Sequence, residues 1–382
     1  MNEPRKLRVA IVGCGQIADA HLQEVRKLPA AQVVAVCDRY PDLARQAAER
    51  FGVPGVFDDV GKMLAESHPD VVHVTTPPHS HAPLARQALA AGTHVYVEKP
   101  FTVDAAEADA VFEAARAAGR LVCAGHDQLF DPSWLELRRR FRDGELGQAV
   151  HVDSIFGYDL SGSFGRVMFS DPGHWLHRLP GGLFHNNISH AVYKITDFLP
   201  DERPRVWATW FGDPDRPSGP PTELRVMLQG AEVSATILFS SRARPVQKLA
   251  RVYGTKQCVE ADLDARVIRR YRPVGAPGPF AKIAAPLSDL SEATRSAARN
   301  AWRFLRSDLH YFAGMNELFR QFYRAIRDGG ESPTPERDVR RVTAIMDAIF
   351  ATAREGQPPA AVGGQPAASA NGRPATAQEV VR

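Results

Sequence analysis

Cysteine is scarce in this chain, with four in 382 residues. The four are Cys14, Cys37, Cys123 and Cys258, and they form no Cys-x-x-Cys pair and show no even spacing. Three of them fall in or beside apolar segments that are typical of buried strands. Reduced thiols in a cytosolic protein explain this usage better than disulfides or a zinc site do. We therefore expect a cytoplasmic protein.

Long apolar runs and a strong net charge are also absent. No run approaches the ~18 residues that a membrane helix needs, so we expect no integral membrane segment. Only residues 1–6 precede the first apolar run, and we expect no signal peptide there. The formal net charge of +3 is too small to argue for a nucleic-acid partner, and the arginine-rich residues 138–140 and 295–306 are interpreted as solvated helix faces.

The first third of the chain alternates strands and helices. Predicted strands cover residues 7–12, 33–37, 71–75, 94–97 and 121–124, and predicted helices cover 17–27, 41–51, 83–91 and 104–118. Unbroken apolar strands that alternate with helices indicate a parallel sheet covered on both faces. We therefore predict an α/β protein whose N-terminal domain, residues 1–125, is a doubly wound parallel sheet.

After Gly125 the pattern changes to short strands linked by turns. A helix is predicted at 133–142, and strands at 148–156, 205–210, 223–228, 232–239, 249–253, 258–262 and 267–271. This spacing predicts a second α/β domain, residues 126–355, with an open, mostly antiparallel sheet. Residues 272–286 are interpreted as a connector, followed by helices at 290–306, 308–327 and 335–354. Residues 356–382 contain almost no large apolar side chains and are expected to be disordered.

A glycine-rich turn lies between the first strand and the first helix. Gly13 permits the tight turn, Gly15 lets the backbone approach a pyrophosphate, and Ala18 allows the helix to pack closely on the strand. Asp38 ends the next strand, where its carboxylate can accept hydrogen bonds from both ribose hydroxyls and would repel a 2′-phosphate. Arg39 beside it can soften that repulsion, so NAD is the predicted cofactor and NADP stays open. The alternative is a doubly wound domain whose turn binds nothing.

A second loop of this sheet carries Thr75-Thr76-Pro77-Pro78, and its prolines favour an extended conformation. Such a loop can support the ribose and nicotinamide of the cofactor from one side. His81 follows it, either as a further cofactor contact or only as the first residue of a helix.

Lys99 lies in the run Val97-Glu98-Lys99-Pro100, where another strand ends. The carboxyl edge of a parallel sheet is where open α/β folds bind ligands. An ammonium group there can hydrogen-bond a substrate hydroxyl and stabilise the oxyanion that develops as hydride leaves carbon. Because X–Pro bonds adopt cis at low cost, Lys99–Pro100 is a candidate cis bond. The alternative is a surface lysine at a strand end.

The stretch 181–190 supplies a candidate proton acceptor. Asn186 and His190 are four residues apart, which places them on one face of a predicted helix that reaches Phe198. A histidine of ordinary pKa, ~6.5, can take the proton of a hydroxyl while hydride goes to the cofactor. His174 and His177 have a spacing compatible with metal, but no acidic or cysteine ligand accompanies them, so no metal is predicted.

Together these segments resemble the glucose–fructose oxidoreductase, inositol dehydrogenase and rhizopine-catabolism (Gfo/Idh/MocA) family. Residues 13–21, 76–81, 90–100, 125–132 and 181–190 match its motifs in the family's order. The resemblance implies an enzyme that uses NAD(P) to oxidise or reduce a sugar, a cyclitol or a sugar nucleotide. It also implies an N-terminal dinucleotide-binding (Rossmann) domain and a C-terminal α/β domain with an open sheet. A homo-oligomer, a dimer or tetramer formed through the C-terminal sheet, is a further implication of the resemblance. Lys99 matches the family's Glu-Lys-Pro lysine and His190 its motif histidine.

Two positions depart from the family's pattern. Asn186 replaces the usual aspartate four residues before the histidine, and Asp127 replaces a common asparagine. Residues 272–306 also exceed what a minimal member needs. A non-catalytic sensor that binds NAD(P) is the alternative to an enzyme, although such a protein would be expected to lose Lys99 or His190.

The predicted catalytic residues are Lys99, His190 and Asn186. The predicted cofactor contacts are Gly13, Gly15, Gln16, Ile17, Asp38, Arg39, Thr76, His81, Glu98 and Lys99.

Overall fold

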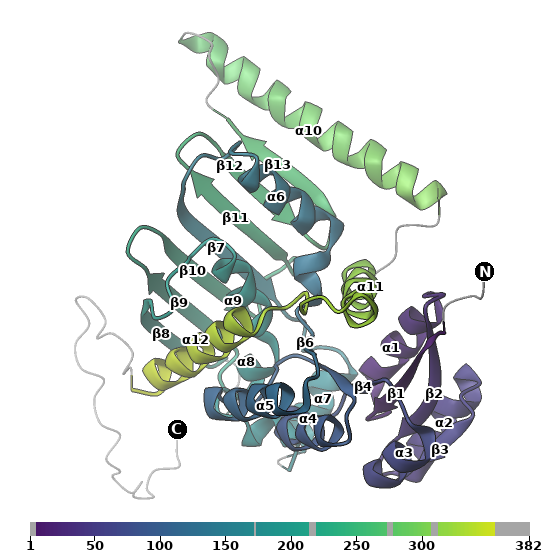
Figure 1. The fold of residues 1–382 in the computed structure, drawn as a ribbon. Helices are drawn as coiled ribbons and strands as arrows, with labels where there is room; N and C mark the ends of the chain where they lie inside the picture. Colours follow the sequence, from purple (N-terminus) through teal and green to yellow (C-terminus); the bar gives the residue numbers. More distant parts are fainter. Residues whose placement is uncertain (1–4, 172, 214–218, 273–277, 307–311, 356–382) are drawn as a thin grey trace, which may run out of the picture.

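The computed structural model describes residues 5–171, 173–213, 219–272, 278–306 and 312–355. They contain two sheets, which Figure 1 shows side by side with helices around them. The first sheet has six parallel strands in the order β3-β2-β1-β4-β5-β6. Its strands are β1 (Leu7–Val12), β2 (Ala31–Cys37), β3 (Gly55–Phe57), β4 (Val71–Val74), β5 (His94–Val97) and β6 (Val122–Ala124).

Helices cover both faces of this sheet, and two apolar clusters fill the space between them. The helices are α1 (Gln16–Arg26), α2 (Pro41–Phe51), α3 (Val60–Ser67), η1 (Pro78–Ser80), α4 (His81–Ala90) and α5 (Ala105–Ala118). The strand order reverses between β1 and β4, which is where a doubly wound sheet opens a crevice for a ligand. The predicted Rossmann topology is confirmed.

The strand β3 and the helix α3, both in the first domain, were not predicted. β3 is three residues long and partly exposed, so it shows no continuous apolar run. α3 has eight residues, and its start depends on a cap in which Asp59 accepts a hydrogen bond from Lys62 N at 2.8 Å. Elements this short give too few turns for periodicity to be read.

The second sheet has seven strands in the order β13-β12-β11-β7-β10-β9-β8. Only β7 and β10 pair in parallel among its described strands, and the other pairs are antiparallel, as predicted. The strands are β7 (Ala149–Gly157), β8 (Arg205–Phe211), β9 (Glu223–Gln229), β10 (Ser234–Ser240), β11 (Lys248–Gly254), β12 (Cys258–Asp262) and β13 (Val267–Tyr271).

One face of this sheet is covered by helices that follow or precede it in the chain. They are α6 (Pro132–Arg142), α9 (Ser189–Thr196) and α12 (Glu336–Glu355). Alternate side chains of β8 and β9 point to the other face, where Trp207 and Met227 are opposite each other in register and each 46% exposed. The other face of the second sheet therefore carries these two exposed apolar side chains, with the polar Thr236, Asp153 and Arg251 in register beside them.

Several short elements connect β6, β7 and β8. They are η2 (Asp127–Phe130), α7 (Ser163–Ser170), η3 (Trp175–Arg178) and α8 (Gly182–Asn187). The single helix predicted to run from the 181–190 motif to Phe198 is instead two helices, α8 and α9, that meet at Ile188. α7 and η3 lie outside every predicted element.

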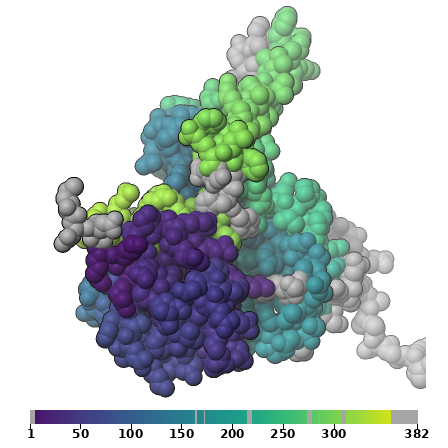
Figure 2. Space-filling view, turned by 90° about the vertical axis from the view of Figure 1, so that its right-hand side faces the viewer, coloured from purple at the N-terminus to yellow at the C-terminus, as the bar shows by residue number. Residues whose placement is uncertain are grey.

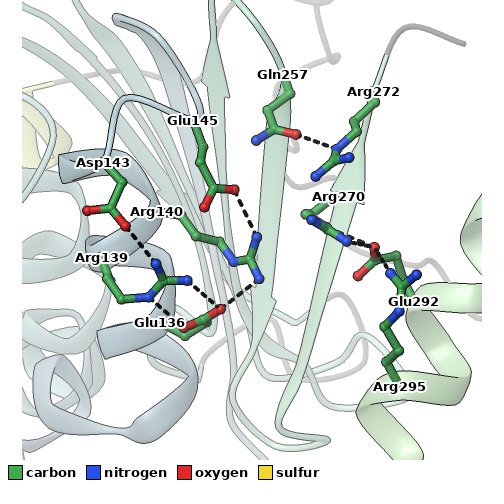
Figure 3. Close-up of polar contacts among 10 residues, drawn as sticks. All are labelled: Glu136, Arg139, Arg140, Asp143, Glu145, Gln257, Arg270, Arg272, Glu292 and Arg295. Atoms are coloured by element: carbon green, nitrogen blue, oxygen red, sulfur yellow. Dashed lines mark hydrogen bonds and ion pairs between the residues drawn. The ribbon is translucent and has the colours of Figure 1, made fainter.

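The predicted connector at 272–286 is wrong in its second half, because helix α10 spans Pro279–Leu305. Pro279 lies in the first helical turn, where proline is well tolerated. Ala and Leu residues around Pro286 favour the helix strongly enough for it to continue past that proline. Arg270 of β13 donates to Glu292 of α10 at 2.8 Å, and Arg295 donates to the same carboxylate (Figure 3). Residues 273–277 lie outside the described ranges.

Most of α10 extends along and beyond the edge of the second sheet, and Figure 2 shows it rising above the rest of the described chain. Apolar side chains on its outer side are more than half exposed: Phe280, Ile283, Leu287, Leu290, Phe304 and Leu305.

Helix α11 (Ala313–Asp328) packs against the first sheet rather than the second. Phe319 and Phe322 join the apolar cluster of β1 and α1. The domain limits 1–125 and 126–355 stay a prediction, and α11 crosses that division in space. The first residues of the helix predicted at 308–327, and the tail 356–382, lie outside the described residues. No described helix is long and apolar enough to cross a membrane.

Candidate active site

The glycine-rich turn forms one wall of the site at the carboxyl edge of the first sheet. Gly13 has φ +97°, and a Cβ there would lie 2.7 Å from Thr76 Cγ2, so only glycine fits. A Cβ on Gly15 would meet nothing within 4 Å. α1 begins at Gln16 with no side-chain cap, which leaves backbone N–H groups directed at this open space. The turn can therefore receive a pyrophosphate at the start of α1.

Asp38 stands beside this turn, immediately after β2. Its carboxylate accepts hydrogen bonds from Cys14 N at 2.7 Å and from Tyr40 N at 2.9 Å. The first bond ties the acidic residue to the glycine-rich turn. Arg39 is exposed and lies over the Tyr40 ring, 4.7 Å from its centroid. This arrangement fits an adenosine ribose next to the pyrophosphate position.

The loop after β4 is held by His81. His81 is 1% exposed, and its ring nitrogens lie 2.7 Å from Thr76 O and 2.9 Å from Pro100 O. The imidazole thus joins the loop after β4 to the loop after β5, and its contacts are with backbone. Thr76 is half-buried and takes a hydrogen bond from Ser80 Oγ at 2.7 Å.

A chain of buried polar side chains lies behind the lysine loop. Glu98 Oε1 is 2.9 Å from His21 Nε2, His21 Nδ1 is 2.8 Å from His73 Nδ1, and His73 Nε2 is 2.9 Å from Tyr323 Oη. One set of neutral tautomers satisfies every bond: Tyr323 donates to His73, His73 donates to His21, and His21 donates to Glu98. Burial would raise the pKa of Glu98, but the bond to His21 and the charge of Lys99 hold it below its ordinary value.

Lys99 follows Glu98 and reaches across to the second domain. The Lys99–Pro100 bond is cis, as predicted. Lys99 Nζ donates to Asn186 O at 3.2 Å. The backbone N–H of Lys99 donates to Glu98 Oε2 at 3.1 Å, so the buried chain fixes the backbone from which the lysine extends.

Lys99, Asn186 and His190 line one cleft of about 650 Å³. The structure therefore brings together the three predicted catalytic residues from both domains. Of the predicted cofactor contacts, Gln16, Ile17 and Glu98 line the same cleft. The remaining lining side chains are predominantly polar and include Asp127, Gln128, Asp131, Asn187, Lys248, Asp264, Arg266 and Asn300.

His190 is 8% exposed and stacks on Phe156, with ring centroids 5.2 Å apart. Its Nδ1 lies 2.6 Å from the Tyr193 hydroxyl. Burial lowers the pKa of His190 well below its ordinary value, and the charge of Lys99 acts in the same direction. The ring is therefore neutral at neutral pH and able to accept a proton.

The sequence model of a family described as "Oxidoreductase family, NAD-binding Rossmann fold" matches residues 7–126. This is the Gfo/Idh/MocA family. Residues 7–126 of this chain are similar to it. The chain's glycine-rich turn, its Asp38 and the free start of α1 fit the NAD that the family binds.

Relatives and solved structures extend the likeness beyond the first domain. The chain is 24% identical to D-apiose dehydrogenase of Paraburkholderia graminis over 92% of its own length and 89% of that protein. It is 39% identical to inositol 2-dehydrogenase 4 of Saccharopolyspora erythraea, over 38% of its own length and less than half, 44%, of that protein. The fold also matches the WlbA dehydrogenase of Bordetella pertussis in complex with NADH and UDP-GlcNAcA, with a TM-score of 0.74, 20% identity, and 92% and 97% of the two chains covered.

Several polar residues of the site could not be recognised as site residues from the sequence. Lys248 begins β11, and Arg266 lies in the turn after β12 with φ +51°, so both reach the cleft through the long-range pairing of the second sheet. Tyr193 follows the motif histidine by three residues and was not singled out. Family motifs cover none of these positions.

The side chains of His174 and His177 make local contacts with the backbone. His174 Nδ1 accepts a hydrogen bond from Leu176 N, and His177 Nε2 lies 2.9 Å from Met168 O. Among the residues that the structure describes, no group of three or more His, Cys, Asp or Glu side chains is placed to hold a metal ion.

Lys194 is a fully buried lysine beside the site. Among the residues that the structure describes, its Nζ has no hydrogen-bond partner, and it lies 6.0 Å from the centroid of the Phe156 ring. Burial lowers its pKa to about 7, and the charge of Lys248 contributes in the same direction. An unfolded lysine keeps its proton up to its ordinary pKa, so between these two values the unfolded chain binds more protons than the folded one.

We expect Lys194→Met to stabilise the protein by about 1–3 kcal/mol at neutral pH, because an apolar side chain replaces an unpartnered buried cation. In the parent protein, this lysine makes stability rise from about pH 7 to about pH 9, and the variant loses that contribution. Urea denaturation midpoints at both pH values measure the two effects. Lys62→Met, at an exposed lysine, is the matched control. A variant less stable than the parent at neutral pH would contradict the prediction.

Proposed function

We propose that this chain is an NAD-dependent dehydrogenase that oxidises a hydroxyl carbon of a polyhydroxylated small molecule, or reduces the corresponding carbonyl. The observation that carries the proposal is the meeting of Lys99 and His190, one from each domain, in a single cleft beside the glycine-rich turn. A non-catalytic nucleotide sensor would have no use for this pair.

Each group has a role that follows from its position. Lys99 donates a hydrogen bond to the reacting oxygen and stabilises negative charge on it. His190, held neutral by burial, accepts the hydroxyl proton. The backbone carbonyl oxygen of Asn186 accepts a hydrogen bond from the lysine ammonium, and its side-chain amide, in the lining of the cleft, can bind the substrate. When bound at the turn formed by Gly13 and Gly15, NAD supplies the acceptor for the hydride.

The polar lining of the cleft supports a sugar, a cyclitol or a sugar nucleotide as substrate. Side-chain amides, carboxylates and cations converge on it, and such groups can pair with several hydroxyls at once. Relatives of this chain are named as dehydrogenases of D-apiose, inositol and a D-glucoside, and one structural neighbour was solved with UDP-GlcNAcA.

The cytoplasm is the proposed location. The four cysteines are free thiols, and three of them are buried. Free thiols are typical of proteins that stay in a reducing compartment.

We expect Lys99→Ala to lower kcat at least about 100-fold, since it removes the group that stabilises charge on the reacting oxygen. The assay follows NADH absorbance with a panel of sugars, sugar acids, cyclitols and UDP-sugars. Binding of NADH, followed by its fluorescence, should change little, and Lys62→Ala serves as the exposed-lysine control.

Unchanged turnover in Lys99→Ala would refute the assigned role. Failure of the parent protein to turn over any member of the panel, with NADH bound, would favour the sensor.

We also propose that NAD is preferred over NADP and expect NADH to bind at least about tenfold more tightly than NADPH. The Asp38 carboxylate is tied to the glycine-rich turn after the second strand, and its negative charge would repel a 2′-phosphate on a nucleotide bound there. Asp38→Ala should reduce the difference between the NADH and NADPH affinities. Glu113→Gln, at an exposed residue of α5, should leave this difference unchanged. Fluorescence titration with both nucleotides measures it. Equal affinity of the parent protein for both would contradict the preference.

We further propose a homo-oligomer, a dimer or tetramer, that assembles through the open face of the second sheet. The exposed apolar side chains Trp207, Met227 and Phe211 lie on that face, and Arg225 lies over the Phe211 ring.

Light scattering after size exclusion should show more than one copy at micromolar concentration. Trp207→Glu combined with Met227→Glu should yield monomers, because charges are costly to bury at such a face. Leu43→Glu, at an exposed apolar residue of α2, should not. A monomeric parent protein, or an unchanged double variant, would contradict the proposal.

A further inference from the structure

We propose that helix α10 pairs with the α10 of a second copy of this chain, in the antiparallel direction and through its exposed apolar side. This contact is separate from the open face of the second sheet. α10 lies beside β13 at one edge of that sheet, whereas Trp207 and Met227 lie on β8 and β9 at the other edge. The proposal goes beyond the proposed activity and does not depend on it.

Helix α10 is attached to the rest of the chain by its polar side. Glu292 accepts a hydrogen bond from Arg270 of β13 at 2.8 Å (Figure 3). Asn300 donates to Ala265 O at 2.9 Å, and Ser296, on the same side of the helix, is buried. A surface helix ordinarily turns its apolar side to the core and its polar side to water. α10 has the opposite arrangement, which leaves its apolar side for a partner.

The apolar side forms a regular stripe along the helix. Its members follow one another at alternating spacings of three and four residues: Phe280, Ile283, Leu287, Leu290, Thr294, Ala297, Ala301 and Phe304. Every one of them is exposed. This alternation gives a period of about 3.5 residues, which is the pattern of helices that pair with another helix. The stripe therefore indicates a helical partner.

Charge is kept away from this stripe and from the positions that flank it. The charged residues of α10 and of its C-terminal cap are Lys282, Asp289, Glu292, Arg295, Arg299, Arg303 and Arg306. The flanking positions instead hold mostly small, uncharged side chains, among them Ala284, Ala293 and Ala298. Charged flanks would repel an identical helix, whereas small uncharged flanks let two identical helices approach closely. The occupant that fits is another α10 rather than a lipid surface, for which close approach has no value.

The sizes of the side chains along the stripe give the direction of pairing. Large side chains occupy its first half, and small ones most of its second half. If two copies run antiparallel with their middles aligned, the facing pairs are Phe280 with Phe304, Ile283 with Ala301, Leu287 with Ala297, and Leu290 with Thr294. Large side chains then face small ones along the centre, and two aromatic pairs close the ends. A parallel pair would set large against large and leave small opposite small.

The contact is large enough for a specific interface. Six apolar side chains of the outer side are each at least 60% exposed in the single chain: Phe280, Ile283, Leu287, Leu290, Phe304 and Leu305. Covering on the order of 100 Å² of each, on both copies, buries roughly 1,200 Å², the lower end of the range for specific complexes. A contact of this size holds two copies weakly by itself, so it adds to the assembly through the second sheet and does not replace it.

The test is disulfide trapping in the full chain. Ala293 is exposed and flanks the stripe at the middle of the helix, so in the antiparallel pair it lies beside Ala293 of the second copy. Two cysteines can be bridged only when their Cα atoms come within about 7 Å. We expect Ala293→Cys at micromolar concentration with oxidised glutathione to give a covalent dimer that dithiothreitol reverses. The parent protein, whose four thiols are free, sets the background.

Ala301→Cys is the matched control, because Ala301 is also an exposed alanine of α10. In the antiparallel pair it lies roughly 27 Å along the helix axis from Ala301 of the second copy. It should therefore give at least about tenfold less dimer than Ala293→Cys. A parallel pair would bring the two copies of Ala301 face to face, so an equal or greater yield from Ala301→Cys would overturn the antiparallel assignment.

The stripe itself is tested in the Ala293→Cys background. Leu287→Glu combined with Leu290→Glu should lower the yield of dimer at least about tenfold, because carboxylates are costly to bury in an apolar contact. Both side chains are exposed in the single chain, so the fold should tolerate the change, and circular dichroism checks this. Lys282→Glu, at an exposed residue off the stripe, should leave the yield unchanged.

No dimer from Ala293→Cys above the background, or a yield that Leu287→Glu with Leu290→Glu does not lower, would overturn the pairing. The parent protein should stay in solution when vesicles of phosphatidylcholine and phosphatidylserine are sedimented at low salt. Sedimentation with the vesicles that the two glutamates abolish would assign the stripe to a lipid surface and refute the proposal. Neither readout uses turnover or NADH, so a failure of the pairing is distinguishable from a failure of the proposed activity.

Discussion

The arrangement of the site depends on the burial of one carboxylate, Glu98. A buried carboxylate is costly unless hydrogen bonds and charge compensate it, and here α1 supplies His21, β4 supplies His73 and α11 supplies Tyr323 behind it. These bonds join elements that are far apart in the chain, and they fix the end of β5. Lys99 can project into the cleft at a defined point because the residue before it is held in this way.

The first domain could be predicted almost completely from its sequence, for local reasons. Strand runs, glycines at turns and Asp38 at a strand end are each recognisable from a short stretch of sequence, and the alternation of strands with helices indicates a parallel sheet. β3 escaped because three half-exposed residues carry no periodicity. The start of α10 escaped because Pro286 suggests a break, while the favourable residues on both sides of it extend the helix.

In the candidate site, only the residues that lie in sequence motifs could be predicted. Lys99, Asn186 and His190 stand in recognisable runs, and the structure brings them to one cleft. Tyr193 also lies beside a motif, but no motif states that its hydroxyl meets His190 Nδ1. His81 shows the converse case. It fits a motif, yet its ring nitrogens contact backbone carbonyl oxygens of Thr76 and Pro100, and the ring holds the loops after β4 and β5 together.

The positive charges around His190 have two opposite effects on the proposed proton transfer. Besides burial, Lys99, Lys194 and Lys248 lower the pKa of His190, which keeps the base free but makes its protonated form costly once the substrate proton arrives. The same cations favour negative charge on the reacting oxygen, so they stabilise the deprotonated substrate while they destabilise the protonated histidine. The ammonium of Lys194, which has no hydrogen-bond partner among the described residues, shows how much cationic charge lies behind the site.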